Sequence, residues 1–156
     1  MQISIHLATP DEASRIAAMA VALTGEIMER TGTRHFNVNL LETTALCRRL
    51  MKAGSYIALV ASEGAEPLGY AGLCESHALY TEGTFGIIQE FYVVSAARSA
   101  GVGAALLDGA RTHGRSIGWK RLELCTPPLP DFERTLAFYE RNGFEVTGGR
   151  KMKALL

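Results

Sequence analysis

The pattern of apolar and polar positions predicts a strand and two helices at the start of the chain. Apolar residues occupy every second position over residues 3–7, which is the period of a strand with one buried face. A proline and two acids over residues 9–12 favour a helix start, and apolar residues then recur at helical spacing up to Gly32. Asn39, with a glutamate three residues later, predicts a second helix over residues 40–52.

Three β-prone runs occupy the middle of the chain. Residues 56–60 and a run over residues 68–73 that extends as far as residue 80 flank a turn-like segment, so they predict a hairpin. Residues 85–94 are apolar on both alternating faces apart from Gln89 and Glu90. This is typical of a strand in the centre of a sheet.

A strand–helix–strand unit is predicted next. Apolar residues recur every three or four positions from Gly101 until Gly118, and they connect the central strand to a β-prone run over residues 121–126. A crossover helix of this kind joins parallel strands.

The end of the chain predicts one more helix and a hairpin. Asp131 is placed to cap a helix that ends near Asn142, and residues 144–147 and 150–154 flank a Gly-Gly pair. The order of elements predicts one α/β domain over residues 1–156, with a central mixed sheet of six to seven strands and about four helices.

Composition narrows the class of partner. The 156 residues, of which 47% are hydrophobic, suffice for one domain with a core. Because 16 basic residues balance 16 acidic ones, no strong field draws the chain to nucleic acid or to an anionic membrane. We therefore expect a small molecule or a peptide as partner.

Location and metal content follow from what the sequence lacks. The N-terminus has no charged-then-apolar order of a signal peptide, and no apolar run approaches the ~20 residues that span a bilayer, so we expect a cytoplasmic protein. Cys47, Cys74 and Cys125 are widely spaced, without the close pairs of a zinc site or a disulfide framework. We expect no metal.

A segment of small residues separates the central strand from the crossover helix. Gly101 and Gly103 let the backbone turn tightly there, and the N–H groups at the start of the helix, with the helix dipole behind them, suit a pyrophosphate. Taken alone, the two glycines are equally explained by capping or packing of the helix. There is no Gly-Lys-Ser/Thr end of a Walker loop and no third glycine of a dinucleotide fold, which disfavours nucleoside triphosphates and NAD.

The hexapeptide Arg98-Ser99-Ala100-Gly101-Val102-Gly103 matches the signature Arg/Gln-x-x-Gly-x-Gly/Ala of the GNAT superfamily of N-acetyltransferases. The chain resembles that family in detail over residues 85–144, and by element order before them. The resemblance implies a GNAT-like fold and acetyl-CoA as co-substrate, held between the strands that end near residues 94 and 126. It implies that backbone groups of three strand residues bind the pantetheine arm and that seven residues of the turn and helix bind the pyrophosphate. These residues are Phe91, Tyr92 and Val93 for the arm, and Arg98, Ser99, Ala100, Gly101, Val102, Gly103 and Ala104 for the pyrophosphate.

A base is required, because an amine with a pKa of ~10 is almost wholly charged at neutral pH. Glu90 is the only acid on the central strand, and its apolar surroundings disfavour the charged form of a carboxyl, which makes it a stronger base. The resemblance places it where many family members hold a catalytic glutamate, acting directly or through water. The alternative is that Glu90 faces solvent or pairs with an arginine such as Arg121.

Tyr139 is the candidate acid for the leaving thiolate, by resemblance to the family segment Phe/Leu-Tyr-x-x-x-Gly-Phe. The alternative is that Tyr139 packs in the core, because it shares a helical face with other apolar residues. Family members often carry Asn seven residues before this tyrosine, whereas Phe132 stands here, which puts one polar contact to the coenzyme in doubt. Cys125 has no His or acid beside it in sequence, so direct transfer is favoured over an acyl-cysteine route.

These features predict an N-acetyltransferase that moves an acetyl group from acetyl-CoA to a primary amine by direct attack in a ternary complex. The acceptor is left open between a small-molecule amine and a peptide N-terminus, and a homodimer is common in the family. The first alternative is a module that senses acyl-CoA without turning it over. The second is an interaction domain without a ligand.

Overall fold

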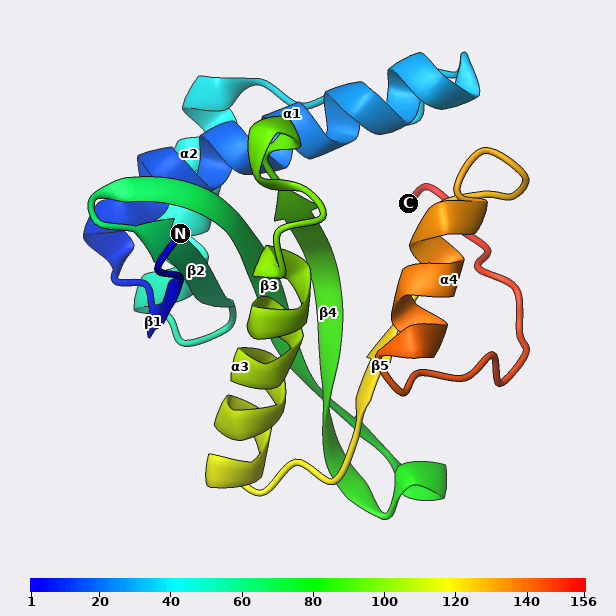
Figure 1. Cartoon of the computed structure of the whole chain (residues 1–156). Helices are drawn as coiled ribbons and strands as arrows, with labels where there is room; N and C mark the ends of the chain where they lie inside the picture. Colours follow the sequence, from blue (N-terminus) through cyan, green and yellow to red (C-terminus); the bar gives the residue numbers. More distant parts are fainter. The chain divides into compact units, whose positions relative to one another are not determined.

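Five strands form one mixed sheet in the order in which they occur in the sequence (Figure 1). The first four pair antiparallel, whereas the last two run parallel, as the strand–helix–strand pattern predicts. The strands are β1 (Ser4–Leu7), β2 (Ile57–Glu63), β3 (Glu66–Ala78), β4 (Gly83–Val93) and β5 (Leu122–Leu124).

The computed structural model describes all 156 residues, and the chain divides into two compact units. Unit 1 spans Met1–Leu124 and contains the whole sheet, and unit 2 spans Cys125–Leu156.

Three α-helices belong to unit 1: α1 (Ala13–Thr31), α2 (Leu40–Lys52) and α3 (Val102–Ser116). Short 3₁₀ turns, Pro10–Glu12, Leu79–Thr81 and Ser95–Ala97, precede α1, link β3 to β4 and follow β4. The sequence predicted the bounds of α2 correctly, because Asn39 accepts a hydrogen bond from the Glu42 N–H at 2.8 Å and so caps the helix.

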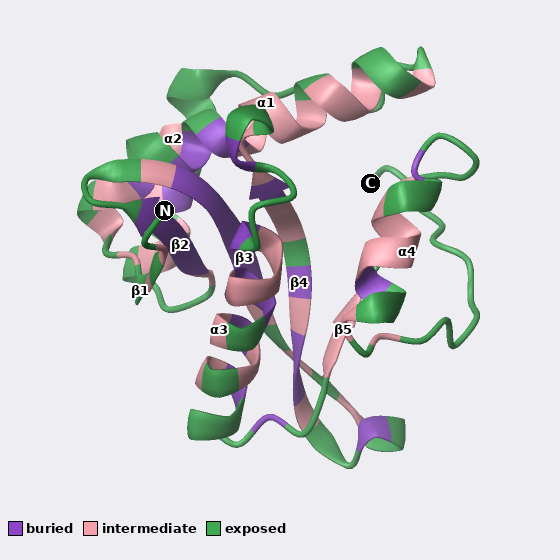
Figure 2. Ribbon diagram, in the orientation of Figure 1, coloured by how far each residue is buried: buried purple, intermediate pink, exposed green.

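The helices cover both faces of the sheet. Residues of α1 and α2 cluster with Ala58, Val60, Tyr70 and Tyr92. Leu59 points to the opposite face, where it lies under α3 near Gly109. Figure 2 shows β2 and the adjoining part of β3 as largely buried, which explains why their sequences are apolar at consecutive positions.

Unit 2 contains one helix, α4 (Glu133–Arg141), and no strand. The predicted closing hairpin over residues 144–147 and 150–154 is wrong, so the sheet has five strands rather than six to seven. Val146 and Met152 are 72% and 90% exposed, and a two-stranded hairpin that buries no apolar face is marginal in water.

The start of α4 also differs from expectation. Phe132, not Asp131, is the N-cap residue, and no side chain caps the helix. Phe132 has a backbone ψ of 32° and is 6% exposed, so its buried ring anchors the first turn where a polar cap was expected.

No helix of the chain is both long and apolar enough to cross a membrane. No cluster of three or more His, Cys, Asp or Glu side chains has the arrangement of a metal site.

Candidate functional site

A β-bulge in β4 sets the direction of Glu90. Gly72 of β3 pairs with Glu90 and Leu73 pairs with Ile88, so Gln89 is an extra residue on β4. A bulge of this kind locally increases the twist and changes where the following side chain points. Gln89 is exposed, whereas Glu90 is half-buried.

Tyr56 holds the carboxylate of Glu90. Its hydroxyl donates a hydrogen bond of 2.7 Å to Glu90 Oε2. Arg121, the arginine named from the sequence as an alternative partner of Glu90, pairs with Glu123 at 2.6 Å. Sequence reasoning missed Tyr56, because it lies 34 residues away from Glu90 and belongs to no motif.

Weakly acidic side chains surround Glu90. Burial, with the negative charge of Glu90 as a further cause, raises the pKa of Tyr56, Tyr70, Cys47 and Cys74. The four groups therefore remain protonated and uncharged at neutral pH. Tyr70 is completely buried, and no partner meets the geometry of a hydrogen bond to its hydroxyl, although Tyr56 lies close enough to affect its pKa.

The turn after β4 has the backbone geometry of an anion site. Ser99 and Gly101 have φ angles of 63° and 85°, and Gly101 is the N-cap residue of α3. A Cβ at Gly101 would meet no atom within 4 Å, so the left-handed backbone and not the available space favours glycine. The N–H groups of Val102, Gly103 and Ala104 follow in the first turn, where an α-helix provides no partner for them.

Arg98 connects this turn to α1. Its Nη2 lies 2.7 and 2.8 Å from the two carboxylate oxygens of Glu26, and its Nε donates to the Val93 carbonyl oxygen at 2.9 Å. The guanidinium also lies 5.7 Å from the centre of the Tyr92 ring. An open depression lined by Glu26, Glu29, Arg30 and Arg98 adjoins these contacts. The role of Glu26 was not foreseen, because its spacing is that of an ordinary helix residue.

The edge of β4 that faces β5 is paired along only part of its length. β5 pairs with β4 only at Gly86, Ile87 and Ile88. β3 continues along the other edge as far as Val93. Over Phe91, Tyr92 and Val93 the edge towards β5 therefore has no strand beside it in unit 1, and an extended ligand can align there as another strand would.

Tyr139 lies on α4, in unit 2. Its ring packs against Phe138 and Phe144, with centroid separations of 5.3 and 5.7 Å. Burial raises the pKa of its hydroxyl, which stays protonated. The structure thus brings Glu90, the edge of β4 and the residue 98–104 turn together in unit 1, whereas Tyr139 belongs to unit 2.

Three solved acetyltransferase structures have a fold similar to that of this chain. An aminoglycoside acetyltransferase from an uncultured soil metagenomic sample has 21% identity and a TM-score of 0.78, with 100% of both chains covered. A ribosomal-protein-alanine N-acetyltransferase from Brucella melitensis biovar Abortus 2308 has 18% identity and a TM-score of 0.74, over 99% of this chain and 100% of that one. A predicted acetyltransferase from Clostridium acetobutylicum, solved with acetyl-CoA, has 13% identity and a TM-score of 0.78, over 98% of this chain and 96% of that one.

At these identities the similarity shows the fold alone. No curated protein sequence matches the chain. The family model described as Acetyltransferase (GNAT) domain matches residues 54–146, which include β4, the turn, α3 and α4. Because this match covers more than half of the chain, the protein belongs to the GNAT acetyltransferase family.

Proposed function

We propose that this acetyltransferase moves an acetyl group from acetyl-CoA to a primary amine by direct attack in a ternary complex. The observation that carries the proposal is the arrangement on β4. One strand presents Glu90 at its bulge and ends in the turn that leads to the N-terminus of α3.

The residues of unit 1 fit the coenzyme. The N–H groups of Val102, Gly103 and Ala104, together with the turn over residues 98–101, suit a pyrophosphate. The β4 edge over residues 91–93 suits the amides of the pantetheine arm. Bound acetyl-CoA supplies the thioester carbonyl that the amine attacks. Because Glu26 and Val93 already hold the guanidinium of Arg98, we assign Arg98 chiefly to shaping the turn.

Glu90 takes the proton of the amine. An alkylammonium with a pKa of ~10 must lose a proton before it attacks, and a carboxylate accepts it directly or through one water. The neighbouring tyrosine and cysteine side chains are protonated at neutral pH. Glu90 is therefore the base in this cluster.

Tyr139 gives a proton to the departing thiolate in this proposal. Its raised pKa keeps the proton available but also makes the hydroxyl a weaker acid. Its contacts with Phe138 and Phe144 suit the alternative role in packing equally well. We treat residues 1–156 as one catalytic domain, because the family match extends from unit 1 into unit 2.

The proposal also names the class of acceptor. Two structural neighbours are an aminoglycoside acetyltransferase and a ribosomal-protein-alanine N-acetyltransferase. For this chain we propose a primary amine of a small molecule or a peptide N-terminus as the acceptor. A cytoplasmic location and a possible homodimer complete the proposal. One observation favours the alternative of an acyl-CoA sensor: buried Phe132 offers no polar side-chain atom where the family often has Asn.

Release of free thiol from acetyl-CoA tests the proposal, with kanamycin, spermidine, L-lysine and an alanine-initiated peptide as acceptors. Glu90→Gln should lower turnover on the order of 10²-fold and leave CoA affinity nearly unchanged. Glu63→Gln, at the end of β2, is the matched control and should keep the wild-type rate. Thermal stabilisation by CoA without thiol release from any acceptor would support the sensor instead.

A further inference from the structure

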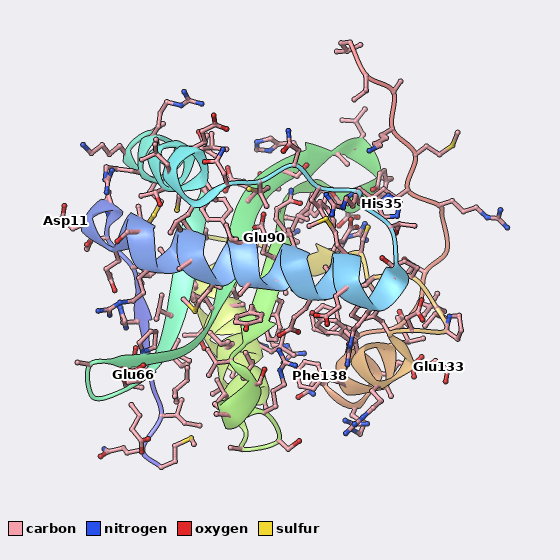
Figure 3. All side chains as sticks on the ribbon, turned by 90° about the horizontal axis from the view of Figure 1, so that it is seen from above. Asp11, His35, Glu66, Glu90, Glu133 and Phe138 are labelled. Atoms are coloured by element: carbon pink, nitrogen blue, oxygen red, sulfur yellow. The ribbon has the colours of Figure 1, made fainter.

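Tyr56, Gly72 and Glu90 lie side by side across three neighbouring segments of the sheet. Gly72 pairs with Glu90, and Leu73, the residue after Gly72, pairs with the first residue of β2. Tyr56 immediately precedes β2, so its side chain reaches Glu90 by crossing over Gly72. Glu90, labelled in Figure 3, lies two residues before Tyr92 on β4, so the two side chains point to the same face of the sheet, where Tyr92 clusters with residues of α1.

The space over Gly72 is filled by this pair. A Cβ at position 72 would overlap the Tyr56 hydroxyl and would lie 2.7 Å from Glu90 Oε2. Gly72 does not have a positive φ angle. The backbone therefore does not require glycine at this position, whereas the Tyr56–Glu90 contact does.

We propose that Tyr56 is a positioning residue for Glu90. The Tyr56 hydroxyl holds the Glu90 carboxylate in one orientation, within the space left by Gly72, and favours the charged form of the carboxylate. The inference rests on the proposed role of Glu90 as the base. A hydroxyl that donates to a carboxylate at 2.7 Å forms a charge-assisted hydrogen bond, which is stronger than one between neutral groups. Tyr56 acts on the acceptor only through Glu90.

Other titratable groups face this part of the sheet. Burial keeps the thiols and the Tyr70 hydroxyl protonated, and Glu26 of α1 is paired with Arg98. His35, between α1 and α2, is exposed. The groups are Cys47 and Arg48 of α2, Tyr70 and Cys74 of β3, and Glu26 of α1.

The first test measures the carboxyl directly, in the coenzyme-free protein. The ¹³C resonance of the Glu90 carboxyl, assigned by its loss in Glu90→Gln, is followed through a pH titration. In Tyr56→Phe the midpoint should move to higher pH by about one unit, because the anion loses a hydrogen bond. Tyr70→Phe is the matched control: it removes a hydroxyl of the same cluster that makes no hydrogen bond to Glu90 and keeps the Tyr56 hydroxyl, so the midpoint should stay in place.

The second test is the pH dependence of kcat/KM, with the fastest acceptor of the panel above. Tyr56→Phe should lower the plateau about tenfold, move the acidic limb upward and leave the KM for acetyl-CoA unchanged. An unshifted midpoint and limb in Tyr56→Phe, with activity still lost in Glu90→Gln, would overturn the inference and leave the proposed function intact. Wild-type activity in Glu90→Gln would remove the catalytic role of Glu90, and with it the positioning role of Tyr56, whatever the titration shows.

Discussion

Gly72→Ala tests how the sheet supports the site. The added methyl group would lie 2.6 Å from Tyr56 Cζ, whereas ordinary contact begins at about 3.4 Å, so the end of the ring must move by about 0.8 Å. The hydroxyl lies farther along the same axis and overlaps the methyl more closely, which breaks its hydrogen bond to Glu90.

The expected loss of stability follows from three contributions. Overpacking costs about 1–3 kcal/mol, and losing a hydrogen bond to a charged group costs about 1.5–3 kcal/mol. Replacing glycine in a strand recovers roughly 0.5–1 kcal/mol of backbone entropy. The net decrease in the free energy of unfolding is about 3 kcal/mol, which for a chain of this length lowers Tm by about 6–12 °C.

Scanning calorimetry measures Tm, and the pH dependence of thiol release measures the effect on Glu90. The acidic limb should shift upward as in Tyr56→Phe. Gly25→Ala is the matched control, because Gly25 lies within α1 and a Cβ there meets nothing within 4 Å. It should raise stability by about 0.5–1 kcal/mol. A Gly72→Ala protein that melts as high as Gly25→Ala, with an unshifted limb, would refute the reasoning.

Two further predictions concern charges elsewhere in unit 1. Arg98→Lys keeps the charge, but lysine cannot form both the Val93 contact and the paired contact with Glu26. Calorimetric titration should therefore show an affinity for CoA that is about tenfold weaker. An equal affinity would mean that the charge alone suffices. For Glu12, burial opposes ionisation, but hydrogen bonds from His6 and the Thr9 N–H hold the pKa of the carboxyl below its usual value. Glu12→Gln should therefore reduce stability at pH 7, and urea unfolding should show the difference shrinking as the pH falls below about 4; a difference that grows in acid would contradict this.

Local signals in the sequence predicted local structure well. The bounds of α2 follow from Asn39, and α3 begins after Gly101, because a cap and a left-handed glycine act within a few residues. The prediction of a C-terminal hairpin is wrong because Gly148 and Gly149 supply turn geometry, but the flanking residues bury no apolar face.

The contacts around Glu90 could not be predicted in this way. They depend on the register of β2, β3 and β4 and on one extra residue at Gln89. The apolar pattern of β4 is compatible both with a regular strand and with a strand that carries this bulge. The sequence therefore identified Glu90 as a candidate but not Tyr56 or Gly72, which shape its surroundings.

The contacts of Arg98 have a consequence for the entropy of coenzyme binding at the proposed site. Glu26 and the Val93 carbonyl hold the guanidinium through contacts within the chain itself, so folding orders the turn over residues 98–101. A loop that is ordered on folding does not lose that freedom again on association. If the proposed pyrophosphate binds at the N-terminus of α3, part of its affinity is therefore preorganisation supplied by Glu26 of α1, a helix outside the turn.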